Sequence, residues 1–292
     1  MSKGLLDPKV DFVFKNIFGS PNHPEILISF LNATLKAKKK IVNVDIKKTD
    51  IEKQYIEDKY SRLDVKATTS NDEIINIEIQ LKNENNMVKR SLYYLSKMYE
   101  EQLNEKEDYS KLVRTVCINI LNFKYLKTDN FHTGYRFKEI ESNEELTDIM
   151  EVHFIEIPKL QDSSDEKDML VAWTEFLKDP ESEKVRGLEL SIEEIRQAKD
   201  ELIRMSNDST QRELYDMRAN SLRDKMSELN AAERKGIEKG REEGREEGRK
   251  EGIEEGRKEE KIEIARNMKL SGLDINTIAK ITNLSEDEID KL

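Results

Sequence analysis

Cysteine is nearly absent from this chain of 292 residues, and histidine is scarce. The single cysteine, Cys117, excludes a disulfide within the chain and any site that needs a cluster of thiolates. It lies in the apolar run VRTVCINIL, where a small buried residue is expected. The histidines His23, His132 and His153 are far apart in the sequence without zinc-ligand spacing, so we expect solvated or capping roles for each.

Long apolar runs and an excess of positive charge are missing as well. No apolar run approaches the roughly 18 residues that a membrane span needs, so we expect a soluble cytoplasmic protein with no membrane partner. The net charge of −11 argues against a basic surface over the whole chain, the usual mark of non-specific nucleic-acid binding. No glycine-rich phosphate loop follows a predicted strand, which argues against an ATPase.

Charged residues, in contrast, make up 38% of the chain against 36% apolar residues, which is too polar for all of it to be buried. The length predicts one core with an extension, or two units. Lysines gather locally in KAKKKIVNVDIKK, where Lys38, Lys39 and Lys40 could bind phosphate although the whole chain is acidic. A solvated helix end is an equally good interpretation of this block.

Two neighbouring segments show the period of two that is typical of half-buried strands. In EIINIEIQL, Glu78 and Gln80 share the face opposite the isoleucines, and in RLDVKAT, Asp64 and Lys66 share one face. The intervening TTSND (68–72) is rich in turn formers, so an antiparallel hairpin is predicted. Such a hairpin would bring Asp64 towards Glu78 and Gln80.

Two carboxylates brought together in this way repel each other unless a cation lies between them. Oxygen-rich sites with one or two carboxylates suit Mg²⁺ or Mn²⁺. Periodicity by itself leaves a second interpretation open, in which Asp64 and Glu78 line a solvated polar face, because acidic residues are common on such faces.

The spacing of Asp64 and Glu78-x-Gln80 resembles the active-site signature of the PD-(D/E)XK nuclease superfamily, with glutamine in place of the usual lysine. Longer segments resemble the Rpn family of recombination-promoting nucleases and transposase-like proteins. These segments are DPKVDFVFKNIFG (7–19), KRSLYYLSKMYEEQL (89–103), DYSKLVRTVCINILNF (108–123) and HFIEIPKL (153–160). The resemblance covers about the first 160 residues, and the C-terminal third only in style.

The resemblance implies an α/β (mixed α+β) fold with a restriction-endonuclease-like core, in which helices flank a mixed central sheet, plus a helical C-terminal extension. It also implies a Mg²⁺- or Mn²⁺-dependent endonuclease that hydrolyses DNA phosphodiester bonds, with Asp64 and Glu78 as metal ligands. Gln80 can orient water but cannot serve as a cation or general base. Either Lys82, on the same strand parity as Gln80, or Lys66, beside Asp64 on the paired strand, could supply the charge. The alternative is a catalytically degenerate nuclease fold that binds nucleic acid or protein.

The resemblance leaves two possible roles open for each of two further residues. Asp11 is either an auxiliary acid of the site or the partner of Lys15 in an ordinary i,i+4 pair. Arg90, one helical turn before Tyr94, either contacts DNA phosphate or supports the sheet.

Four parts are expected along the chain. Residues 1–160 form the nuclease-like core, 161–230 a helical extension, 231–262 a charged helix or linker, and 263–292 a small tail that resembles a helix-turn-helix. In the core, periodicity predicts helices at 12–18, 24–35 and 86–104, and strands at 41–46, 63–68, 74–81, 113–122, 134–140 and 152–157.

Glycine recurs every fourth residue from 236 to 256. On a straight helix this stripe drifts by roughly 40° per step, and each interior glycine costs about 1 kcal/mol relative to alanine. Pairs of opposite charge at i,i+4 favour a helix nonetheless. A solvated helix or linker and a self-association seam of a homo-oligomer both remain open. The tail is not basic, which favours docking or dimerisation over DNA reading.

Overall fold

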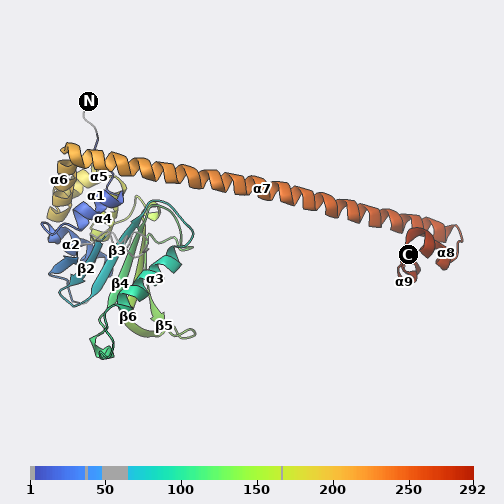
Figure 1. Cartoon of the computed structure of the whole chain (residues 1–292), viewed down its shortest axis with the longest axis horizontal. Helices are drawn as coiled ribbons and strands as arrows, with labels where there is room; N and C mark the ends of the chain where they lie inside the picture. Colours follow the sequence, from blue (N-terminus) through green and yellow to red (C-terminus); the bar gives the residue numbers. More distant parts are fainter. Residues whose placement is uncertain (1–3, 37–38, 48–64, 166) are drawn as a thin grey trace. The chain divides into compact units, whose positions relative to one another are not determined.

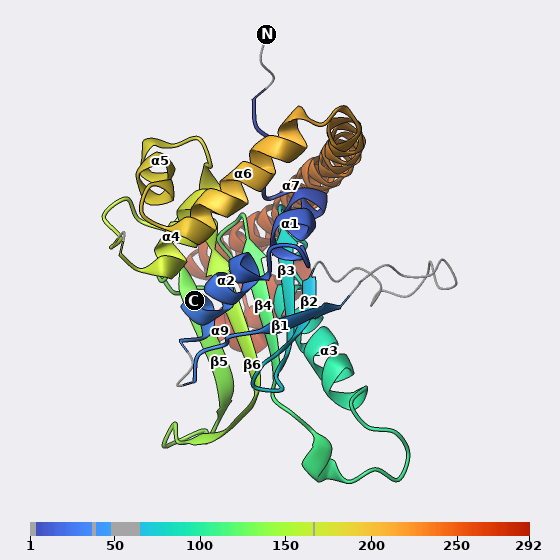
Figure 2. The same ribbon diagram turned by 90° about the vertical axis from the view of Figure 1, so that its left-hand side faces the viewer.

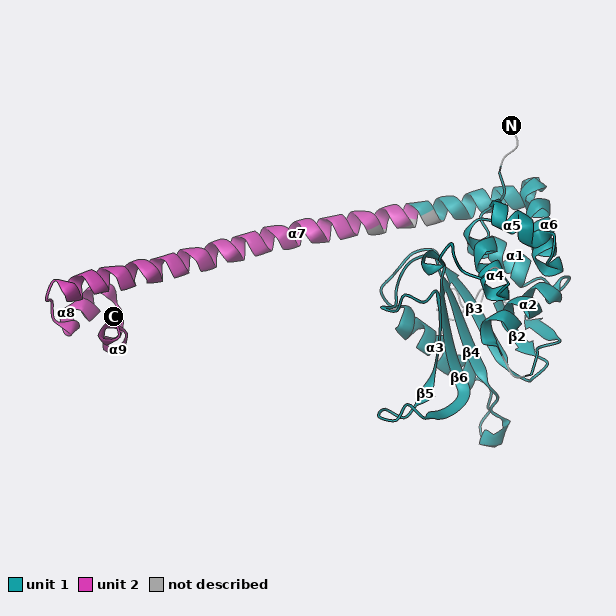
Figure 3. Ribbon diagram, turned by 180° about the vertical axis from the view of Figure 1, so that it is seen from behind, with its two compact units in different colours: residues 1–223 teal, residues 224–292 magenta. Residues whose placement is uncertain are grey.

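The computed structural model describes residues 4–36, 39–47, 65–165 and 167–292 and divides into two compact units, residues 1–223 and 224–292 (Figure 3). Of the predicted site residues, Lys38 and Asp64 lie outside the described residues. Each unit has its own apolar core. The predicted division at 160, 230 and 262 stays a prediction.

The first unit is built on a six-stranded mixed sheet with the strand order β1-β2-β3-β4-β6-β5 (Figure 1). The strands are β1 (Val44–Lys47), β2 (Val65–Thr69), β3 (Ile74–Gln80), β4 (Thr115–Leu121), β5 (His132–Lys138) and β6 (Glu145–Glu156). Strands β3, β4 and β6 run parallel, and the other pairs are antiparallel. The predicted hairpin of β2 and β3 is confirmed, with Val65 opposite Ile77.

Helices cover both faces of this sheet (Figure 2). On one face, helices from two parts of the chain share a core with the isoleucines of β3. They are α1 (Asp11–Phe18), α2 (Pro24–Leu35), α4 (Met169–Lys178), α5 (Glu183–Glu189) and α6 (Glu193–Asn207). On the other face, α3 (Met87–Glu100) packs on β4 and β6 through Leu95 and Phe154. This is the predicted architecture of a mixed sheet flanked by helices.

The layer formed by α3 changes the environment of the polar face of β3. The alternation of Asn76, Glu78 and Gln80 predicted a half-buried strand, but Asn76 is 0% and Glu78 is 1% exposed. The interpretation in which Glu78 lines a solvated face is therefore wrong, because α3 covers this side of β3. Burial without water makes each polar atom on this face depend on a protein or ligand partner.

Strand β6 is longer than predicted, because its first half, ELTDIM, lacks an apolar alternation and is exposed or half-buried. Two short 3₁₀ turns, η2 (Tyr109–Lys111) and η3 (Ile157–Lys159), precede β4 and follow β6. Glu156, the last residue of β6, is fully buried. It contacts both the connection between β4 and β5, through Tyr125, and the turn η3, through Lys159.

Helix α7 (Ser209–Leu270) begins in the first unit and continues into the second, which contains the whole glycine repeat. No atom lies within 4 Å of a Cβ built on any glycine from 236 to 256, so these positions are open. The second unit ends with α8 (Ile275–Thr282) and α9 (Glu286–Asp290), packed around Ala265, Ile278, Leu284 and Ile289. Within the part of the chain that the structure describes, none of the helices combines the length and apolar character needed to span a membrane.

Candidate active site

Glu78 occupies the centre of the buried polar face between β3 and α3. The carboxylate Oε2 accepts a hydrogen bond of 3.1 Å from Nε of Arg90 on α3. The other oxygen, Oε1, is buried and has no hydrogen-bond partner among the described residues. One half of the carboxylate is therefore satisfied by the protein and the other half is open to a ligand.

The pKa of Glu78 reflects both its burial and its pairing with Arg90. Burial raises the pKa of Glu78 above its usual value, whereas the charge and the hydrogen bond of Arg90 oppose that rise. The guanidinium of Arg90 lies over the ring of Tyr94, with Cζ 5.3 Å from the ring centroid. A buried carboxylate needs a compensating cation, and Arg90 supplies one within the protein.

Other polar side chains surround Glu78 on the same face. Asn119 is its neighbour in register on β4, and the Asn119 Oδ1 accepts a 2.8 Å bond from Ser91 Oγ on α3. The Oδ1 of Asn76 is a second buried oxygen without a partner among the described residues. Burial, together with the negative charge of Glu78, raises the pKa of the Cys117 thiol to about 12, so this thiol stays protonated and is no nucleophile.

Asp64, the other predicted ligand, directly precedes β2 in the sequence. The first residue of β2, Val65, pairs with Ile77, and Ile77 directly precedes Glu78. The approach of Asp64 to Glu78 stays a prediction.

The residues predicted to assist Asp64 and Glu78 in the chemistry lie at different places in the fold. Gln80 is the last residue of β3 and partly exposed, and its carbonyl accepts a 2.9 Å bond from Asn122 N. Lys66 faces the same side of the sheet as Asn76, its partner in register, and its ammonium lies 3.9 Å from a carboxylate oxygen of Glu101. Lys82 lies two residues beyond the end of β3, and its role in supplying charge stays a prediction.

Asp11 makes a long-range contact instead of the local pair. Its Oδ2 accepts a 3.0 Å bond from Nη1 of Arg218 on α7, and within the described chain no ion pair joins it to Lys15. Helix α1 packs on the face of the sheet opposite to α3. Asp11 therefore ties the first helix to α7.

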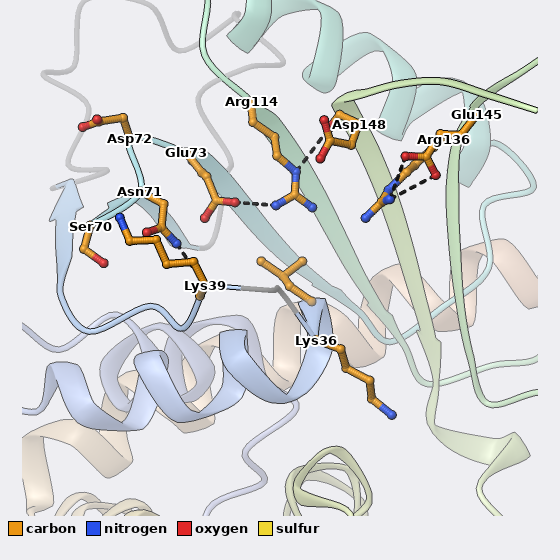
Figure 4. A pocket seen from close by; sticks show the side chains of 11 residues that line it. Lys36, Lys39, Ser70, Asn71, Asp72, Glu73, Arg114, Arg136, Glu145 and Asp148 are labelled. Carbon is orange, nitrogen blue, oxygen red and sulfur yellow. Dashed lines mark hydrogen bonds and ion pairs between the residues drawn. The ribbon is translucent and has the colours of Figure 1, made fainter.

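The lysine block leads to a separate cavity of about 640 Å³ (Figure 4). Lys36 and Lys39 line it, and the carbonyl of Lys39 accepts a bond from the side chain of Asn71, just before β3. Lys40 is exposed nearby in the sequence. Glu78 lies in the C-terminal half of β3, so the structure places Lys39 at the opposite end of this strand.

Arg114, in the wall of this cavity, belongs to a network of charges that sequence reasoning missed and that includes the buried carboxylates Glu73 and Glu151. Figure 4 shows the Arg114 guanidinium between Glu73 and Asp148. Arg114 also bonds Glu151, which in turn accepts a 2.7 Å bond from Nε2 of His153. Its donors are thus occupied by protein oxygens, which leaves little of this guanidinium for an anion.

The prediction of solvated or capping roles is wrong for His132 and His153. His132 Nε2 lies 2.9 Å from His153 Nδ1 across the β5–β6 pair, and His153 is only 4% exposed. Gly134 makes room for this arrangement, because a Cβ there would lie 3.1 Å from the His153 ring. The two-residue spacing of Glu151 and His153 was a weak signal, but the partner His132 comes from a different strand.

Among the described residues, no group of three or more His, Cys, Asp or Glu side chains converges into a metal site. Neither a search of curated proteins nor one of solved structures gave a match. Two family models match, one described as PD-(D/E)XK nuclease family transposase over residues 8–232 and one as the C-terminal HTH domain of the Rpn/YhgA-like nuclease family over residues 258–292. PD-(D/E)XK nucleases typically use divalent metal ions. Since the first model spans most of the chain, and the second continues the resemblance to its end, this protein belongs to the Rpn-type PD-(D/E)XK nuclease family transposases.

Proposed function

We propose that this protein is a Mg²⁺- or Mn²⁺-dependent DNA endonuclease that hydrolyses phosphodiester bonds. The observation that carries the proposal is Oε1 of Glu78, a buried carboxylate oxygen without a partner among the described residues. It lies on the strand whose hairpin partner begins directly after Asp64. Hard oxygen ligands of this type fit Mg²⁺ and Mn²⁺, so the residues present suit the metal that the family uses.

In this proposal Asp64 and Glu78 hold the metal. A bound divalent ion supplies a water of lowered pKa and neutralises charge on the phosphate. Gln80, at the exposed end of β3, orients water through its amide, and Lys66 brings positive charge to the same side of the sheet. The metal-ligand role of Asp64 is supported by its place in the sequence signature.

DNA binding away from the metal is assigned to the lysine block, with Lys38, Lys39 and Lys40 as phosphate contacts. Lys39 and Lys40 are exposed, as this role requires. Lys39 lies near the start of β3 and Glu78 near its end, so a bound duplex has to span both ends of this strand. Asp11, paired with Arg218, supports the fold in this proposal and takes no part in the chemistry.

The C-terminal unit is proposed to dock or dimerise. In α9 the residues Glu286, Asp287, Glu288 and Asp290 are all exposed, and an acidic helix is repelled by the DNA backbone. The open glycine positions of α7 permit close approach of a second helix in a homo-oligomer.

Isothermal titration calorimetry with Mn²⁺ tests the metal site. We expect the wild type to bind Mn²⁺ and an Asp64→Ala, Glu78→Ala double variant to lose this binding. The matched control is an Asp129→Ala, Glu141→Ala variant, which removes the same charges from exposed positions and should bind as the wild type does. Equal binding by the wild type and the Asp64, Glu78 variant would refute the site, and DNA binding without metal binding would favour the catalytically degenerate alternative.

A further inference from the structure

We propose that Arg90 is a positioning residue that fixes one oxygen of Glu78 and presents the other to the metal, an inference that rests on the proposed metal-dependent function. The sequence placed Arg90 among the DNA contacts or sheet supports. Its observed partner is the carboxylate itself, with Nε of Arg90 3.1 Å from Oε2 of Glu78. Because this bond engages Oε2 alone, Oε1 is the oxygen left for a metal.

The guanidinium of Arg90 is fixed by a ring contact, and the helix that carries it is tied to the sheet. It stacks over the ring of Tyr94, which is 3% exposed and therefore fixed by packing. Helix α3 is tied to the sheet one residue further on, where Ser91 Oγ bonds Asn119, the neighbour of Glu78 in register. A side chain anchored in this way can impose one orientation on the carboxylate, as hydrogen-bonding partners of metal ligands do.

Positioning and electrostatics predict opposite effects for the loss of Arg90. A cation beside the site repels a metal ion, so a purely electrostatic role predicts tighter metal binding when the charge is removed. Loss of the bond that orients Glu78 predicts weaker binding, by the about 10–100-fold typical for partners of metal ligands. A role as a DNA contact predicts unchanged metal binding and weaker DNA binding.

Titration with Mn²⁺ alone, followed by the electron paramagnetic resonance signal of the free ion, separates these roles in the full chain without DNA. We expect Arg90→Gln to weaken Mn²⁺ binding by about 10–100-fold. Arg90→Lys, which keeps a charged donor, should weaken it less than Arg90→Gln does. Lys89→Gln, the exposed neighbour on the same helix, is the matched control and should bind Mn²⁺ as the wild type does.

Unchanged or tighter Mn²⁺ binding by Arg90→Gln overturns the positioning role, and so does unchanged Mn²⁺ binding combined with weaker DNA binding. Thermal unfolding without metal establishes that each variant is folded. Where Arg90→Gln does not fold, Arg90→Lys decides, and binding as tight as that of the wild type contradicts the inference. Absence of Mn²⁺ binding in the wild type refutes the proposed function itself and is recognised without any variant.

Discussion

Two buried carboxylates of this protein, Glu78 and Glu151, are compensated by arginines from other elements. Glu78 is paired with Arg90 from α3, and burial raises its pKa. Burial alone would also raise the pKa of Glu151, but hydrogen bonds from His153, Arg114 and Arg136 lower it to about 2. The first carboxylate keeps one open oxygen, whereas the second is saturated, which separates a candidate ligand site from a structural network.

The Glu151 network makes stability depend on pH. Burial and the neighbouring His153 lower the pKa of His132 to about 4, so below about pH 6.5 the unfolded chain binds a proton that the folded chain refuses. Stability should fall by at most about 3 kcal/mol as the pH decreases from about 6.5 to 4. For Glu151, whose pKa is lowered, the stability present above about pH 4.5 is lost as the pH falls towards 2.

Urea titrations at pH 7 and pH 5 test the histidine contribution. His132→Gln keeps a donor near His153 Nδ1 but cannot be protonated, so its free energy of unfolding should change less between these pH values than that of the wild type. An equal loss in both proteins would show that His132 is not the titrating group.

At the scale of elements, the connection between β4 and β5 is fixed by one buried ion pair. Glu156, at the end of β6, accepts bonds from the backbone N–H groups of Tyr125 and Leu126. Its second oxygen lies 2.7 Å from Nζ of Lys159, which also donates to the carbonyls of Leu126 and Thr128. This pair therefore joins η3 to the preceding loop.

We expect Lys159→Met to destabilise the protein by about 3–5 kcal/mol, because Glu156 would be left buried without its cation. Lys124→Met, an exposed lysine of the same connection, should change the free energy of unfolding by less than about 0.5 kcal/mol. Chemical denaturation of both variants provides the comparison, and similar stability of the two would show that the Glu156–Lys159 ion pair does not stabilise this connection.

The elements of the sheet were predictable where one strand carries its own signal. The alternation in 74–81 and the turn formers in 68–72 predicted the β2–β3 hairpin, and the apolar run around Cys117 predicted β4. Residues 145–151 lack such an alternation, so the first half of β6 was missed. Partners across elements, such as Arg90 with Glu78 or His132 with His153, follow from tertiary packing and leave no periodic mark in the sequence.

At the scale of the whole molecule, the first family match ends at residue 232 and the second begins at 258, so the glycine repeat at 236–256 lies between them. The first unit holds the sheet and all described residues of the candidate site, and the second has a separate small core. Chemistry and assembly are therefore expected to be separable.

Truncation after residue 235 should leave DNA cleavage within about twofold of the full chain per protomer but lower the oligomeric mass. Light scattering measures the mass, and thermal unfolding establishes that the truncated chain is folded. A truncated protein that kept the oligomeric mass of the full chain would rule out the assembly role of the C-terminal unit.

A plasmid-cleavage assay in Mg²⁺ and Mn²⁺ tests most directly whether Asp64 and Glu78 support metal-dependent DNA cleavage. The wild type should nick or cut the plasmid, and Asp64→Asn should nearly abolish cleavage without unfolding the chain, because asparagine keeps the shape but loses the charge that holds the metal. Gln80→Ala should reduce the rate by less, since orienting water is only part of the catalysis. Equal cleavage by the wild type and Asp64→Asn, or no cleavage by the wild type with either metal, would contradict this role of Asp64 and Glu78.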